Sequence, residues 1–153
     1  MNLEYSGREQ IPAAPEAVWA FIIDPANIAA CMPDVIETRI VGARAFDVVV
    51  QIAVGPVRGK FTFHVVLDPR PGGERMNVKI GGGGFGSVLD LVAAANLARN
   101  GNGTVLTWNG TATIRGRVAA AGGHVIDAQA KRVISAMFAG VKSKLTPPSI
   151  DIR

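Results

Sequence analysis

The sequence has 153 residues, of which 48% are hydrophobic and 18% are charged, a balance typical of a single globular domain with a sizeable core. The formal net charge of +4 is modest, and aromatic residues are not interleaved with the scattered Lys and Arg residues, which argues against a nucleic-acid-binding protein. The single cysteine excludes an internal disulfide, and no apolar run reaches the roughly 20 residues that are needed to cross a bilayer.

The first 32 residues predict a strand followed by two short helices. Residues 1–10 lack the basic and apolar regions of a signal peptide, so we expect a cytoplasmic protein. Residues 3–11 predict an edge-like strand that ends at Pro12. Residues 14–24 begin with a Pro-Glu pair that suits the first turn of a helix. Pro25 ends this helix, because the residue before a proline is disfavoured in helical conformation, and starts a second helix over residues 25–32.

From Val35 to Ile114 the hydrophobic period changes to two, which is typical of strands with one buried face. The clearest strands are residues 46–54, 60–67, 75–80, 87–98 and 104–116. The segments between them are dense in Gly, Pro and Asn and predict hairpin turns over residues 55–59, 69–74, 81–86 and 99–103. This region therefore predicts an antiparallel meander of about six strands.

Residues 124–145 place apolar side chains at helical spacing, from Ile126 to Leu145, and predict the longest helix. At about 1.5 Å per residue this helix spans roughly 33 Å, which matches the length of a ten-residue strand. The order of elements predicts an α+β helix-grip fold, in which a curved antiparallel sheet of six or seven strands surrounds the long C-terminal helix. We expect one domain over residues 1–145 and a disordered tail over residues 146–153.

Four motifs carry a resemblance to a known family. The segment DPANIAACMPD at residues 24–34 and the segment VGPVRGKF at residues 54–61 resemble, in order, two motifs of the carbon monoxide dehydrogenase CoxG family. The glycine run at residues 81–86 and the helix start at residues 122–133 are also similar to that family's pattern. The resemblance covers residues 1–145 and implies the START-like (SRPBCC) helix-grip superfamily.

The sequence departs from this family at two places. The family often has Gly where this chain has Asp34. Many members also continue into a Pro- and Ala-rich tail with a final apolar, membrane-associating segment, whereas this sequence stops at Arg153.

Cys31 is interpreted as a small, packed apolar residue, with a reactive thiol and a metal ligand as the alternatives. A nucleophilic cysteine needs a base within reach and an oxyanion donor. The chain has only His64 and His124, and no sequence signature links either of them to Cys31. One Cys and two distant His also lack the spacing of a zinc site, so we expect no metal.

No other motif predicts catalysis. The glycine run at residues 81–86 is followed by a strand-like pattern and lacks the Lys-Ser/Thr pair of a phosphate-binding loop. Asp47 and Asp90 fall on predicted strands without any sign that they face each other, as the carboxylates of a glycosidase do. We therefore expect no catalytic residue, no cofactor and a non-enzymatic protein.

A curved sheet need not fill the space around a helix that it grips, and the resemblance implies an apolar cavity between the inward faces of the sheet and of the long helix. The resemblance implies that the two short helices cap its entrance. For each residue expected to line the cavity, packing in the core is the alternative. The expected lining residues are Ile28, Met32, Phe46, Val50, Ile52, Phe63, Val65, Val78, Leu89, Leu91, Trp108, Ile134, Met137 and Phe138.

The resemblance implies an accessory protein that holds a lipid or a quinone-like molecule. It also implies a partner, a carbon monoxide dehydrogenase or a related molybdenum hydroxylase, which the protein helps to recruit or mature at the inner face of the membrane. The alternative is a small-molecule enzyme of the cyclase or hydrolase type on the same fold. A surface for the partner or for a peripheral membrane contact is expected at Arg58, Lys131, Arg132, Lys142 and Lys144.

Overall fold

The computed structural model describes residues 1–54 and 56–146. Of the predicted tail over residues 146–153, only Thr146 lies within these ranges. The helices are α1 (Pro15–Ile22), α2 (Pro25–Cys31), the 3-10 helix η1 (Arg117–Ala121) and α3 (Gly123–Leu145). The strands are β1 (Asn2–Ile11), β2 (Val35–Gly42), β3 (Ala45–Val54), β4 (Val57–Pro69), β5 (Arg75–Gly84), β6 (Ser87–Asn100) and β7 (Gly103–Gly116).

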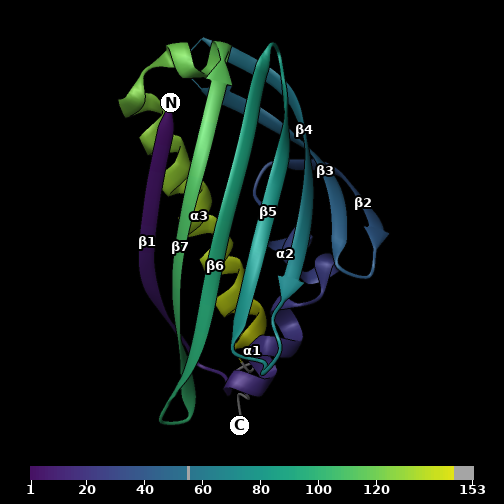
Figure 1. Ribbon diagram of the computed structural model, residues 1–153, viewed down its shortest axis with the longest axis vertical. Coiled ribbons are helices and arrows are strands. Elements are labelled where there is room, and N and C mark those ends of the chain that lie inside the picture. Colours follow the sequence, from purple (N-terminus) through teal and green to yellow (C-terminus); the bar gives the residue numbers. More distant parts are fainter. Residues whose placement is uncertain (55, 147–153) are drawn as a thin grey trace, which may run out of the picture.

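All seven strands form one antiparallel sheet in the order β1-β7-β6-β5-β4-β3-β2. Strands β2 to β7 follow one another as a meander. Strand β1 pairs with the open edge of β7, with Asn2 opposite Thr113 and Ile11 opposite Thr104. The sheet curves around α3, with α1 and α2 at one end of the strands and η1 at the other (Figure 1). The predicted α+β helix-grip fold is confirmed.

The two short helices begin where their prolines predict. Pro15 and Pro25 each occupy a first-turn position, where the missing N–H costs no hydrogen bond. The Asp24 side chain caps α2 by accepting a hydrogen bond from the backbone N–H of Ala26 at 2.9 Å. Helix α2 ends at Cys31, shortly before Pro33, so both helices stay short and cover only one end of the sheet.

The predicted alternation along β3 and β4 is confirmed. Phe46, Val48 and Val50 of β3 are buried, and each lies opposite a buried residue of β4, namely Val65, Phe63 and Phe61 respectively. His64 projects from β4 to the opposite face, where its Nδ1 atom lies 2.5 Å from Oδ1 of Asp47. These cross-strand pairs form the centre of the core.

Two predicted turns are shorter than the sequence suggested. Strand β4 begins at Val57, so Arg58 and Gly59 pair with β3 instead of forming the connection. Strand β5 continues to Gly84, which leaves only Phe85 and Gly86 between β5 and β6. The glycines of β5 resemble a turn in the sequence because they lack side chains, but here they allow the neighbouring backbones to approach closely.

Gly82 is the clearest of these positions. Its φ angle is +152°, and a Cβ atom at this position would lie 2.1 Å from the carbonyl oxygen of Thr62 and 2.9 Å from Cα of Phe63. Both neighbours are backbone atoms, so no rotamer change would relieve the clash. The sheet can therefore keep this local shape only with glycine at position 82.

Candidate ligand-binding cavity

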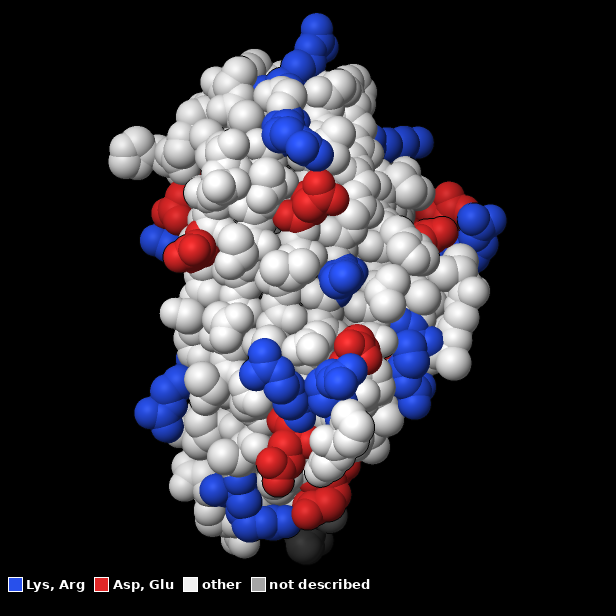
Figure 2. Space-filling model, viewed as in Figure 1, with Lys and Arg blue, Asp and Glu red and all other residues white. Residues whose placement is uncertain are grey.

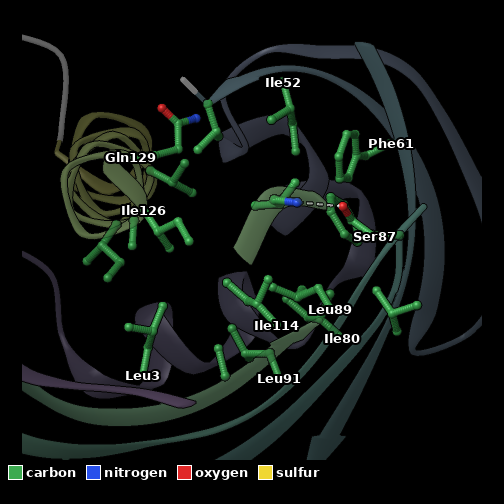
Figure 3. Close-up of a pocket in the computed structure, with 18 of the residues that line it drawn as sticks. Leu3, Ile52, Phe61, Ile80, Ser87, Leu89, Leu91, Ile114, Ile126 and Gln129 are labelled. Carbon is green, nitrogen blue, oxygen red and sulfur yellow. Dashed lines mark hydrogen bonds between the residues drawn. The ribbon is translucent and has the colours of Figure 1, made fainter. Parts of the chain in front are cut away.

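A cavity of about 260 Å³ lies between α3 and the concave face of the sheet. Figure 3 shows α3 on one side, with Ile126 and Gln129, and the sheet residues Leu89, Leu91 and Ile114 across the space from it. The walls are Leu3 and Tyr5 of β1, Met32 after α2, Ile52 and Val54 of β3, Phe61 and Phe63 of β4, Ile80 of β5, Ser87, Val88, Leu89 and Leu91 of β6, Ala112 and Ile114 of β7, Val118 of η1, and Ile126, Gln129, Ala130, Val133 and Ile134 of α3. This composition makes the cavity almost wholly apolar.

The structure brings six of the fourteen expected residues together around this cavity: Met32, Ile52, Phe63, Leu89, Leu91 and Ile134. Three others, Phe46, Val50 and Val65, are buried in the core and do not line it. The remaining five, Ile28, Val78, Trp108, Met137 and Phe138, are partly buried against that core.

The cavity occupies only the half of the grip that is next to the first turns of α3. Farther along this helix Phe138 packs against Trp108 of β7, with their ring centroids 5.6 Å apart. The Trp108 ring also covers Gly7 of β1, where a Cβ atom would lie 2.9 Å from Nε1. Two large aromatic side chains thus occupy space in the second half of the grip, beyond the described cavity.

Sequence reasoning missed the wall that β1 and η1 contribute. Leu3 and Tyr5 reach the cavity because β1 pairs with β7, a pairing between distant segments that no local pattern reveals. Ala130 and Val133 carried a usable signal, since they follow Ile126 at helical spacing. Small side chains such as Ala130 mark the places where space remains between a helix and a sheet.

Among the described residues that line the cavity, three have polar side chains, and all three take part in hydrogen bonds. The Tyr5 hydroxyl donates to Oδ1 of Asp127 at 2.9 Å. The Ser87 hydroxyl oxygen accepts from the backbone N–H of Val118 at 2.9 Å. The Gln129 carbonyl oxygen accepts from Nε of Arg132 at 3.4 Å.

Tyr5 is the only titratable residue among the described residues that line the cavity. Burial raises the pKa of Tyr5, and the hydrogen bond to the Asp127 carboxylate adds to the effect. The pKa of Asp127 is lowered, first by its hydrogen bond with Lys131 and then by the one with Tyr5. The phenol therefore stays protonated at neutral pH, with its proton directed to a carboxylate, and it offers neither a general base nor a nucleophile.

Cys31 lies at the end of α2, is 6% exposed and packs against Gly140 of α3. Burial raises the pKa of the Cys31 thiol, and the opposing effect of the nearby Lys144 charge is smaller. In the described parts of the chain, no group of three or more His, Cys, Asp and Glu side chains is arranged to hold a metal ion. The environment of Cys31 is thus that of a packed, protonated thiol.

Cys31→Ala should lower the free energy of unfolding by about 1 kcal/mol, because it removes one sulfur atom from a packed site. Cys31→Ser should cost more, since it places a hydroxyl group among apolar neighbours. Urea unfolding measures both changes. In the folded parent, a disulfide reagent at pH 8 should modify Cys31 much more slowly than in urea, and equal rates would contradict the buried thiol.

Most of the expected surface cations are held in ion pairs. Nζ of Lys131 lies 3.1 Å from Oδ2 of Asp127, and Nζ of Lys142 lies 2.8 Å from Oε1 of Glu9. Arg132 pairs with Asp34. Asp34 has a φ of +63°, in the left-handed region that Gly adopts freely and that Asp tolerates, which accounts for the Gly that the resembled family often has there. On the sheet face away from α3, basic and acidic side chains are interspersed (Figure 2).

Among the helices of residues 1–54 and 56–146, none has the length and apolar character required to span a membrane.

Comparison with known proteins gives both the fold and the family. No curated protein matches the chain. It is similar to a conserved protein from Geobacillus kaustophilus, with a TM-score of 0.84 and 22% identity over 94% of this chain and 95% of the other. A START superfamily protein from Mycobacterium smegmatis has a TM-score of 0.71 and 11% identity, over 93% of this chain and 96% of the other. The Zhui aromatase/cyclase from Streptomyces sp. R1128 has a TM-score of 0.66 and 13% identity, over 95% and 94%.

At these identities the solved structures show a shared fold only, and that fold is the START-like helix grip described above. The family model of CoxG, a subunit of carbon monoxide dehydrogenase, matches residues 7–146, which is most of the chain. The chain therefore belongs to the carbon monoxide dehydrogenase CoxG family.

Proposed function

We propose that this protein is a non-catalytic carrier that binds a hydrophobic molecule, a lipid or a quinone-like compound, in the cavity beside α3. The observation that carries the proposal is the almost wholly apolar lining of a preformed cavity, in which Tyr5, Ser87 and Gln129 are the only described residues with polar side chains. Apolar walls with a few placed polar groups are characteristic of sites for small hydrophobic ligands.

The chemistry of the lining favours a carrier over an enzyme. An active site for acid–base or nucleophilic chemistry needs at least two reactive groups that converge on the substrate. Among the described lining residues only Tyr5 titrates, and its proton is directed to Asp127. The similarity to an aromatase/cyclase concerns the fold, and a fold by itself does not determine activity.

The volume of the cavity limits the size of the ligand. An engineered cavity of about 150 Å³ holds one benzene molecule. The 260 Å³ found here suits a molecule of one or two rings, or the buried end of a longer chain whose remainder lies outside the cavity. Both a lipid and a quinone-like compound satisfy this condition.

Membership of the CoxG family supports the second part of the proposal. We infer that the protein helps to recruit or mature a carbon monoxide dehydrogenase or a related molybdenum hydroxylase, at or near the inner face of the membrane. The carrier delivers or holds its hydrophobic ligand at that enzyme.

Native mass spectrometry of protein purified without detergent tests the carrier function. We expect an adduct whose mass matches a hydrophobic small molecule and which organic extraction removes. Titration of the extracted protein with a quinone and with a fatty acid then compares the two ligand classes. A protein that carries no adduct and binds neither compound would refute the proposal.

We expect peripheral binding to anionic membranes to be weak. Each free basic residue near such a surface contributes about 1 kcal/mol, but Lys131, Arg132 and Lys142 already pair with carboxylates. Co-sedimentation with phosphatidylglycerol vesicles should exceed that with phosphatidylcholine vesicles at low salt and should decrease at high salt. Equal amounts bound to both vesicle types would exclude an electrostatic membrane contact.

A further inference from the structure

Ser87 is a buried polar residue in an apolar wall. It is the first residue of β6, is only 6% exposed, and lies at the end of the cavity that η1 closes. Figure 3 shows its hydroxyl oxygen facing the backbone N–H of Val118 across a hydrogen bond, with Phe61 beside it.

The hydrogen-bonding capacity of this serine is only partly used. A serine hydroxyl has one proton to donate and two lone pairs that accept. The Ser87 oxygen accepts from the Val118 N–H at 2.9 Å, but its own proton meets no acceptor among the described residues. A buried donor without a partner is unfavourable, and because Ser87 lines the cavity, an acceptor on a molecule bound there would satisfy this proton.

Water is a poor candidate for this acceptor. A buried water molecule normally needs two to four polar partners, and the residues that line the cavity near Ser87, such as Phe61, Leu89, Ile114 and Val118, are apolar. Tyr5 already donates to Asp127. Gln129 is only partly buried, so solvent can satisfy its amide, and it does not require a ligand.

We propose that the Ser87 hydroxyl donates a hydrogen bond to the bound ligand and sets its specificity. The ligand is then an apolar molecule that carries an acceptor oxygen, such as a ketone, ester or ether oxygen, at the end that lies against η1. Its hydrocarbon body occupies the space between α3 and β6. This inference rests on the proposed carrier function and adds to it the chemical class and the orientation of the ligand.

Two probes of nearly the same shape test the proposal: 2-acetylnaphthalene, which has a carbonyl oxygen, and 2-ethylnaphthalene, which lacks it. Isothermal titration of the parent protein should show that the ketone binds about fivefold more tightly than the hydrocarbon, the gain expected from one neutral hydrogen bond. In Ser87→Ala the ratio of the two affinities should fall to about one, so that the preference for the ketone disappears.

A matched control removes a different buried hydroxyl group. Thr104 is 1% exposed, and its hydroxyl donates to the Ala13 carbonyl oxygen at 2.7 Å. It lies near the start of β7, whereas Ser87 lies opposite Gly116 at the end of this strand. Thr104→Val should lower the melting temperature, as Ser87→Ala does, but should keep the preference for the ketone. If Ser87→Ala does not fold, Ser87→Cys keeps a weak acceptor for Val118 and should show a reduced preference.

The possible outcomes distinguish the role of Ser87 from the carrier function. Equal binding of both probes by the parent, a preference that survives Ser87→Ala, or a preference that Ser87→Cys leaves undiminished overturns the role of Ser87 and leaves the carrier function standing. Failure of the parent to bind either probe overturns the carrier function at this site, and the role of Ser87 with it.

Discussion

Ala130→Trp should abolish ligand binding while the protein stays folded. Ala130 projects from α3 into the cavity, so an indole ring at this position takes the place of the ligand. Since about 150 Å³ is needed for a single benzene ring, an indole leaves too little of the 260 Å³ for a second ring system. We expect the affinity for 2-ethylnaphthalene, measured by isothermal titration, to fall by about 100-fold or more.

Two other substitutions on the same helix serve as controls for the effects of an added indole ring on the surface and in the core. Ala128→Trp adds the same ring on the exposed side of α3 and should leave both affinity and melting temperature close to those of the parent. Met137→Trp enlarges a residue that packs against the core outside the cavity, and overpacking of this kind typically costs about 1 to 3 kcal/mol. If Ala130→Trp loses stability as Met137→Trp does and the parent binds no ligand, then the space beside α3 behaves as solid core.

Gly82→Ala should be among the most destabilising single substitutions in the chain. The added Cβ atom would lie 2.1 Å from the carbonyl oxygen of Thr62, and the φ of +152° is one that L side chains rarely adopt. To relieve the clash, β5 must separate from β4 or change its backbone conformation. We expect the free energy of unfolding, measured in urea, to fall by at least about 3 kcal/mol.

The neighbouring residue provides the control. At Gly81 the nearest atom to an added Cβ is Oδ1 of Asp90 at 3.7 Å, an ordinary van der Waals contact. Gly81→Ala should therefore change the free energy of unfolding by no more than about 0.5 kcal/mol. If the two substitutions had equal effects, the loss would reflect a general intolerance of alanine in this strand and not the close approach at Gly82.

The secondary structure could be predicted because its signals are local. Period-two alternation identified the buried faces of β3 and β4, and Pro15, Pro25 and the apolar spacing in residues 124–145 identified the helices. The ends of β4 and β5 were wrong, since glycine in a sequence does not reveal whether it makes a turn or allows two backbones to approach.

The position of the cavity within the grip was harder to predict because it depends on contacts between distant segments. Alternation places both Phe63 and Trp108 on the concave face. Only the three-dimensional structure shows that Phe63 lines the cavity, whereas Trp108 packs against Phe138 of α3 outside it. Tyr5 reaches the cavity only because β1 lies next to β7. A single sequence contains no signal for either contact.

The pairing of β1 with β7 also has a consequence for the order of events during synthesis. The strand that pairs with β1 is β7, so Tyr5 cannot pair until Gly110 has been synthesised, nor Asn2 until Thr113 has been. Strands β2 to β6 can pair one after another as they leave the ribosome, while β1 stays without a strand partner until more than two thirds of the chain exists. Such non-local pairings slow folding, and mixed α/β domains and all-β domains fold more slowly than helical bundles of similar stability. The nascent chain thus leaves its first strand unpaired for longer than any other strand, and unpaired strand edges are prone to aggregation.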